Sequence, residues 1–228
     1  ATVRALKHHG GVEKTQLGEE NIEALTEGFA NLRQHIENVN KFGLPAVVAV
    51  NRFPTDTEKE LETLMKLTEE AGSTAILTEV WGKGGDGAIE LAEKVVELCE
   101  ASESEFKVLY DTELSIKEKI ETVAREVYRA DGVEFTKSVE KKIKDIEALG
   151  SANLPICMAK TQYSFSDDPT LLGAPEGFKI TISDIKLSNG AGFIVVLTGE
   201  IMTMPGLPRV PAANNIDIKE DGEIIGLF

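Results

Sequence analysis

The sequence predicts an α/β fold in which a doubly wound parallel sheet, formed by residues 1–131, is followed by a smaller α+β domain formed by residues 132–228. Short apolar runs alternate with amphipathic helical patterns in the first part, as in parallel sheets covered by helices. Strand and turn patterns dominate after Gly132. At 228 residues and 42% hydrophobic content, the chain has enough apolar material for one large core or two small ones.

The first part shows the two repeats that distinguish helices from buried strands. Apolar residues spaced by three or four predict a helix over residues 19–42, and Pro45 then introduces an apolar run over residues 46–50. Such continuous runs are typical of strands that are buried on both faces of a parallel sheet. The same reasoning predicts further helices from residue 57 and over 88–100 and 116–128, and strands over 75–80 and 106–110.

The second part begins with a charged helix that runs from Thr136 to Gly150. An apolar strand pattern around Cys157 precedes Lys160. Nearly alternating apolar residues over 180–187, a turn at residues 189–192 and an apolar run over 193–197 predict a hairpin. A second, smaller hairpin is expected over residues 216–225.

The charge balance excludes some classes of partner. Lys and Arg total 24 against 39 Asp and Glu, and the resulting net charge of −15 repels phosphate backbones and anionic lipid headgroups. We therefore expect no nucleic acid and no membrane as partners. There is no apolar run long enough for a membrane span and no leader pattern, which favours a cytoplasmic location. Cys99 and Cys157 lack metal spacing and are expected to be reduced, buried thiols, and no metal site is predicted.

Two unusual loops follow predicted strands, where ligands bind in open parallel sheets. They are Asn51–Thr57 and Trp81–Gly87. The amide of Asn51 can donate to and accept from the edge of a base, while Phe53 and Trp81 offer flat apolar faces. Together they describe a slot for a planar ring, which resembles the base-binding part of P-loop nucleotide hydrolases.

A purely structural interpretation of these loops stays open. Asn51 can be a turn residue, Asp56 or Thr57 the N-cap of the next helix, and Trp81 a residue of the core. The glycines favour a ligand site, because four of them within residues 82–87 destabilise a loop unless the backbone must turn sharply or approach a ligand.

Two further segments carry cations or many polar groups. Arg4, Lys7 and two histidines precede Gly10-Gly11 and can face phosphates, or they can form a solvated loop. Residues 160–169 follow a strand and are either a functional loop or a capped turn. Three prolines within residues 205–211 fix an extended path of the kind that lines a site or an interface.

Five segments in order resemble the formate–tetrahydrofolate ligase family, and together they extend over the chain. They are Thr2–Lys7 with His9-Gly10-Gly11, Asn51–Thr57, Trp81–Gly85, Leu154–Ser164 and Thr203–Pro208.

The resemblance implies that ATP phosphorylates formate and that the formyl group passes from formyl phosphate to N10 of tetrahydrofolate. ATP with Mg²⁺ and tetrahydrofolate are the implied co-substrates, and a monovalent cation is a further expected ligand. Phe53 and Trp81 match the aromatic pair that clamps a pterin or adenine ring, and the adjoining pocket residues are Asn51, Pro54, Leu77, Gly82 and Lys83. Arg4, Lys7 and Lys160 are candidates to face anions.

The family's Gly-rich phosphate loop and the arginine that holds formyl phosphate have no match in residues 1–228. The resemblance therefore implies the C-terminal part of the enzyme, with the N-terminal part as a partner and little activity without it. It also suggests a homo-oligomer, a tetramer in the family. Two alternatives stay open: a folate- or nucleotide-binding module without catalysis, and a structural half that supports oligomer contacts.

Overall fold

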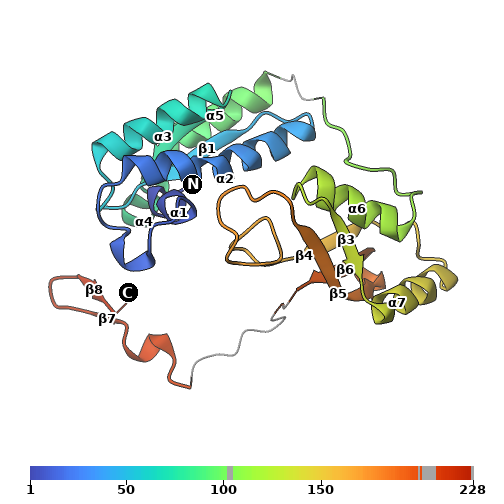
Figure 1. Ribbon diagram of the computed structural model, residues 1–228. Helices are drawn as coiled ribbons and strands as arrows, with labels where there is room; N and C mark the ends of the chain where they lie inside the picture. The colour runs from blue at the N-terminus through green and yellow to red at the C-terminus, as the bar shows by residue number, and fades with distance from the viewer. Residues whose placement is uncertain (102–104, 200, 202–208, 227–228) are drawn as a thin grey trace.

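The computed structural model describes residues 1–101, 105–199, 201 and 209–226. Two separate sheets, each packed against helices, contribute to its two buried hydrophobic clusters (Figure 1). The resembling segment Thr203–Pro208 lies outside the described residues. None of the described helices combines the length and the hydropathy that crossing a bilayer requires.

The first sheet has two parallel strands, and helices surround it. Its strands are β1 (Val47–Asn51) and β2 (Thr74–Thr78), paired in register from Val47 opposite Thr74 to Asn51 opposite Thr78. The accompanying helices and turns are α1 (Val3–His9), η1 (Lys14–Gln16), α2 (Ile22–Lys41), α3 (Glu58–Glu70), α4 (Val80–Lys83), η2 (Gly84–Ala88) and α5 (Ile89–Glu100).

Helices α1 and α2 approach closely through two glycines. A Cβ atom on Gly10 would lie 1.9 Å from the carbonyl oxygen of Ala24, and one on Gly28 would lie 1.8 Å from that of Leu6. Glycine is therefore required at both positions. This contact brings Val3 and Leu6 into a buried cluster with α2, α3 and the two strands.

The second sheet is mixed, with the strand order β3-β5-β6-β4. β5 and β6 form the antiparallel hairpin that the sequence predicts, while β3 pairs with β5 and β4 with β6 in parallel. A bulge between Ile182 and Asp184 keeps Ile180, Ile182 and Ile185 all buried. The elements are α6 (Ile116–Glu126), β3 (Gly132–Phe135), α7 (Lys137–Ala148), β4 (Ile156–Ala159), β5 (Lys179–Ser188), η3 (Asn189–Ala191) and β6 (Phe193–Thr198).

The C-terminal hairpin is also present, in short form. It consists of β7 (Asp217–Ile218) and β8 (Ile224–Ile225), which pair antiparallel after the short turn η4 (Ala212–Asn214).

A mixed α/β architecture with parallel strand pairs is confirmed. The prediction of a strand over residues 106–110 is wrong, because this segment is irregular. The backbone N–H groups of Glu105 and Lys107 donate instead to the carbonyl oxygens of Gly43 and Phe42, directly after α2. β3 is not among the strands that the sequence predicts, and it contains only four residues. The doubly wound, P-loop-like arrangement stays a prediction.

The division at residue 131 also stays a prediction. The packing does form two buried clusters, but α6 contributes Ile116, Ile120 and Ala124 to the second of them, with α7 and the mixed sheet. α6 was placed in the first part on the sequence pattern alone.

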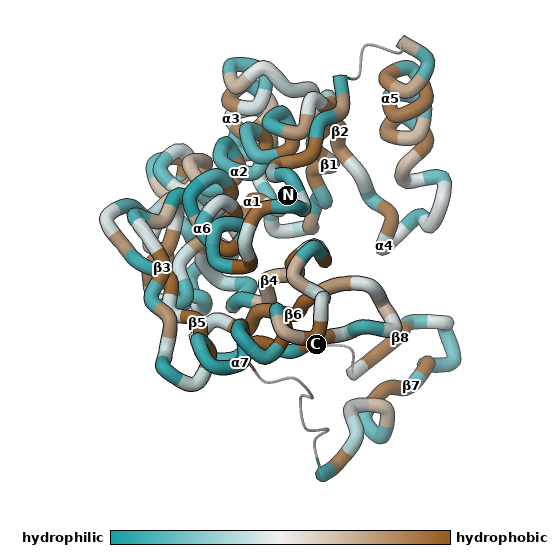
Figure 2. Tube along the Cα trace, turned by 90° about the vertical axis from the view of Figure 1, so that its right-hand side faces the viewer, coloured by the Kyte–Doolittle hydropathy of each residue, from teal (hydrophilic) through white to brown (hydrophobic). Residues whose placement is uncertain are grey.

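Two surface features differ from the sequence expectation. Both cysteines are exposed free thiols and not buried. Hydrophobic residues lie along α5 at the edge of the first part (Figure 2), where Ile89, Val95 and Val96 are exposed, so that this helix does not bury the apolar stripe from which it was predicted.

Candidate functional site

The two unusual loops start side by side. Asn51 and Thr78 are register partners at the carboxyl ends of parallel strands, and the backbone N–H of Arg52 donates to the carbonyl oxygen of Thr78 at 3.0 Å. The pairing of β1 and β2 therefore brings together the segments that contain Phe53 and Trp81, as expected for adjacent parallel strands.

A side-chain hydrogen bond then ties the two loops to each other. The indole Nε1–H of Trp81 donates to the carbonyl oxygen of Arg52 at 2.9 Å. Although its polar edge is held, the side chain of Trp81 is 62% exposed. A fixed and largely exposed indole offers a flat apolar face to a ligand at little cost in ordering.

The loop that carries Phe53 is fixed at its other end by a helix cap. The backbone N–H of Phe53 donates to Oδ2 of Asp56 at 2.8 Å. Thr57 and Glu60 form a reciprocal capping box at the start of α3. Burial raises the pKa of the Asp56 carboxyl, and the bond from Phe53 only partly opposes this.

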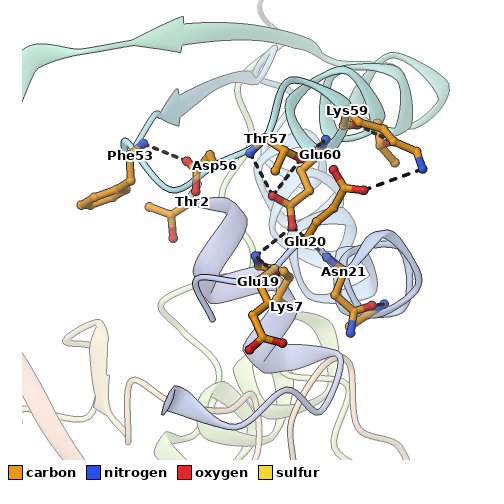
Figure 3. Close-up of polar contacts among 12 residues, drawn as sticks. Thr2, Lys7, Glu19, Glu20, Asn21, Phe53, Asp56, Thr57, Lys59 and Glu60 are labelled. Atoms are coloured by element: carbon orange, nitrogen blue, oxygen red, sulfur yellow. Dashed lines mark hydrogen bonds and ion pairs between the residues drawn. The ribbon is translucent and has the colours of Figure 1, made fainter. Parts of the chain in front are cut away.

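Behind this loop lies a buried ion pair. Nζ of Lys7 is 2.8 Å from Oε1 of Glu60, and both side chains are fully buried. Lys7 also donates to the carbonyl oxygen of Glu19, and the backbone N–H of Asn21 donates to Glu60 (Figure 3). Desolvation raises the pKa of Glu60, but the bonds from Lys7, Thr57 and Asn21 outweigh it and leave this pKa lowered.

The ring of Phe53 points away from this buried network (Figure 3) and is partly buried. The guanidinium carbon of Arg4 lies 5.5 Å from the centre of the ring, a distance at which a cation is attracted to an aromatic face. The exposed Arg4 thus lies beside the loop, whereas Lys7, three residues later, faces the protein interior, where no solvent anion reaches it in this arrangement.

The remaining residues of the proposed slot are distributed around the two loops. Asn51 is half-buried at the end of β1, Pro54 is exposed, and Leu77 packs against the first buried cluster. Gly82 is exposed. Lys83 is exposed and ion-paired with Glu79, and its hydrogen bond to Glu79 lowers the pKa of that carboxyl.

Gly87 returns the second loop to the end of β2. Its carbonyl oxygen accepts a hydrogen bond of 3.0 Å from the backbone N–H of Glu79. A Cβ atom at Gly87 would lie 2.6 Å from the carbonyl carbon and oxygen of Glu79. Close packing of the backbone therefore requires at least one of the four loop glycines, and the presence of this glycine is not evidence for a ligand.

Lys160 lies in a different part of the molecule, after β4. Its ammonium group donates to the carbonyl oxygens of Thr161, Ser164 and Ser166. Desolvation lowers the pKa of Lys160 to about 8. The structure therefore does not bring Arg4, Lys7 and Lys160 together as one anion-binding group.

Sequence reasoning missed one residue that organises the first loop, Glu60. The spacing Thr57-x-x-Glu60 is a capping-box signature, so the sequence contained a signal for Glu60. Nothing in the sequence indicated that Glu60 pairs with Lys7, 53 positions earlier. Among the described residues, no group of three or more His, Cys, Asp or Glu side chains is placed to hold a metal ion.

The family model described as formate–tetrahydrofolate ligase matches residues 1–228.

Proposed function

The chain belongs to the formate–tetrahydrofolate ligase family, and from this premise we propose that it supplies the ring-binding part of an enzyme that joins formate to tetrahydrofolate with consumption of ATP. In the proposed reaction the γ-phosphoryl group of ATP passes to a formate oxygen, giving formyl phosphate and ADP. N10 of tetrahydrofolate then attacks the formyl carbon, the carbon–oxygen bond to phosphate breaks, and N10 loses its proton. The products are 10-formyltetrahydrofolate, ADP and phosphate.

The observation that carries this proposal is the hydrogen bond from the Trp81 indole to the Arg52 carbonyl. It fixes an exposed aromatic face next to the loop of Phe53, at the carboxyl ends of two parallel strands. Stacking of a flat ring on an aromatic side chain contributes about 1 to 3 kcal/mol in nucleic-acid complexes. A pterin or an adenine ring has the shape and chemistry for this slot, with Asn51, Pro54 and Leu77 as its surroundings.

In this proposal the chain acts by positioning. Holding tetrahydrofolate beside formyl phosphate replaces a bimolecular encounter, which can lower a barrier by several kcal/mol. The phosphoryl transfer itself needs charge stabilisation. Residues 1–228 contain no Gly-x-x-x-x-Gly-Lys-Ser/Thr motif, and the described residues include no cluster of three or more His, Cys, Asp or Glu side chains placed to hold a metal ion. We therefore assign the binding of phosphates, and of the Mg²⁺ that accompanies ATP, to an N-terminal part of the enzyme, and we derive no step through the metal.

The proposed function is tested in the complete enzyme with two substitutions of Trp81. We expect Trp81→Ala to weaken binding of tetrahydrofolate or ATP by about tenfold to a hundredfold, because the stacking face is lost. Folding should change little, since the side chain is largely exposed. Trp81→Phe keeps an aromatic face but loses the hydrogen bond to the Arg52 carbonyl oxygen. Comparison of the two variants therefore distinguishes the contribution of ring stacking from that of the hydrogen bond that fixes the loop. Unchanged Michaelis constants for both substrates in Trp81→Ala would contradict the proposal.

A mixing experiment separates the enzyme part from the alternatives. With ATP, formate and tetrahydrofolate present, 10-formyltetrahydrofolate should form when this chain is combined with the N-terminal part, and not with either alone. Ligand binding without product in the mixture would indicate a binding module instead. Oligomer assembly without ligand binding would indicate a structural half.

A further inference from the structure

A cavity of about 230 Å³ lies where the loop after β4 approaches α1 and α2. This loop extends toward the two helices in Figure 1. Five of the residues that line the cavity determine its chemistry: His9, Asn31, His35, Tyr128 and Lys160. None of the lining residues belongs to the loops of Phe53 and Trp81. The cavity thus joins His9 and the Lys160 loop, two sequence features that the proposed function leaves without a role.

The charge of this cavity is opposite to that of the chain. Two imidazoles and one ammonium group line it, and the described lining residues include no Asp or Glu. The chain as a whole carries 39 acidic residues and a net charge of −15. Three basic groups without a lining carboxylate repel one another when protonated, and an anion in the cavity would remove this repulsion.

Hydrogen bonds and packing fix the donors of the cavity. Nδ1 of His9 accepts the backbone N–H of Gly173 at 3.1 Å, so the neutral imidazole carries its proton on Nε2 and can donate it. Asn31 donates to the carbonyl oxygen of Gly173 at 2.9 Å. The ring of His35 lies 4.6 Å from that of Phe165, centre to centre. These contacts hold both imidazoles in place without an occupant.

Lys160 contributes charge and not a direct contact. Its ammonium group already donates to three carbonyl oxygens of its own loop and lies 5.2 Å from the centre of the Tyr128 ring. Desolvation and the neighbouring positive charges lower the pKa of His9 and of His35. For Lys160, only Asp167 opposes the desolvation that lowers its pKa. Since the pKa of both imidazoles lies below the ordinary 6.5, the positive charge of the cavity at neutral pH is mainly that of Lys160. No carboxylate among the described lining residues balances it.

We propose that this cavity is a binding site for a small oxyanion, namely a phosphate group, that accepts the Nε2–H of His9 and is attracted by His35 and Lys160. The volume is sufficient for a phosphate group and several water molecules. The phosphate group can be free inorganic phosphate or part of a larger molecule. Because the site shares no residue with the Phe53 and Trp81 loops, it can be present whether or not the proposed function is correct.

The test uses the fact that the chain has only three histidines. The pKa of each imidazole is measured by NMR in phosphate and in chloride of equal ionic strength. We expect phosphate to raise the pKa of His9 and of His35 by about half a pH unit to one pH unit, since a bound anion favours the protonated imidazole. His8, which bonds to the Val12 carbonyl and does not line the cavity, should change less. Acetate at the same ionic strength shows whether a carboxylate is accepted as well.

Two variants and a control complete the test. His35→Gln removes one basic group at an exposed position, and we expect it to weaken phosphate binding about threefold to tenfold. Lys160→Met should weaken it at least as much, but it can also disturb its loop, which is why both variants are needed. His8→Gln is the matched control and should bind phosphate like the unaltered protein. Equal pKa changes at all three histidines, or equal changes in chloride and phosphate, would overturn the proposal.

Discussion

Three lysines of this acidic chain show how a buried or half-buried ammonium group is accommodated at the scale of single residues. Lys7 pairs with Glu60, whereas Lys119 and Lys160 donate to backbone carbonyl oxygens. Lys119 is fully buried and holds the segment that leads from α7 to β4 through Ala152 and Leu154. Buried charges are tolerated only when paired or fully hydrogen-bonded, so each of these lysines fixes the segment that it contacts.

The Lys7–Glu60 pair is expected to be essential for stability. Glu60→Gln leaves the Lys7 ammonium buried without its counter-ion, and breaking a buried pair in this way costs about 3 to 5 kcal/mol. Urea unfolding measures this change. Lys7→Met combined with Glu60→Leu removes both charges and should recover a large part of the loss. A loss below about 1 kcal/mol in Glu60→Gln would be typical of an exposed pair and would contradict the buried arrangement.

The same pair predicts a dependence of stability on pH. The pKa of Glu60 in the folded protein lies below its ordinary value of 4.5. The unfolded state therefore takes up a proton first as the pH falls, and the contribution of Glu60 is complete above 4.5 and lost as the pH falls through the lower, folded value. The difference in unfolding free energy between the unaltered protein and Glu60→Gln should shrink over this acid range. A difference that stays constant there would contradict the lowered pKa.

At the scale of elements, the loop after β2 depends on a close backbone contact at Gly87. A methyl group there meets the Glu79 carbonyl, so we expect Gly87→Ala to destabilise the protein by about 1 to 3 kcal/mol, as overpacking does. It should also shift the fluorescence of Trp81, the sole tryptophan, because α4 and η2 must move. Gly85→Ala is the matched control, since nothing lies within 4 Å of its added Cβ. Equal effects of the two substitutions would argue against the contact.

The elements also show what the sequence allowed us to predict. Helices and the β5–β6 hairpin follow from local periodicity and turn residues, and the juxtaposition of the Asn51 and Trp81 loops follows from adjacent parallel strands. The run over residues 106–110 is apolar like a strand, but its backbone bonds to the end of α2. Strand β3 contains only four residues, too few for a pattern. The Lys7–Glu60 pair and the His9–Lys160 cavity join segments far apart in sequence, which no local pattern encodes.

At the scale of the whole molecule, α2 connects the two buried clusters. Its apolar face, with Leu25, Phe29 and Ile36, belongs to the first cluster. Its polar residues contact the loop of Gly173 and the end of α6, a helix that belongs to the second cluster. Asn31 donates to the Gly173 carbonyl oxygen, and Gln34 and Asn38 both donate to the Val127 carbonyl oxygen, at 3.1 and 2.9 Å. The link between the clusters along this helix therefore depends on directional hydrogen bonds.

Because Gln34 and Asn38 share one acceptor, their substitutions are expected to be coupled. Each single substitution to Ala leaves the Val127 carbonyl with one donor and should cost about 1 kcal/mol, the typical net value of a hydrogen bond. The double substitution leaves a carbonyl without a donor, at an added cost of about 1 to 3 kcal/mol, so that the total exceeds the sum of the singles.

Urea unfolding of the four proteins in this double-mutant cycle measures the coupling. It is followed by Trp81 fluorescence for the first part and by far-ultraviolet circular dichroism for the whole chain. If α2 is what makes the parts unfold together, the two signals should coincide in the unaltered protein and separate in the double variant. Glu37 lies on α2 and forms an exposed ion pair with Arg129. Glu37→Gln should cost less than about 1 kcal/mol, and the two unfolding signals should still coincide in this variant. Strictly additive costs with coincident signals would show that the clusters are joined by contacts other than those of α2.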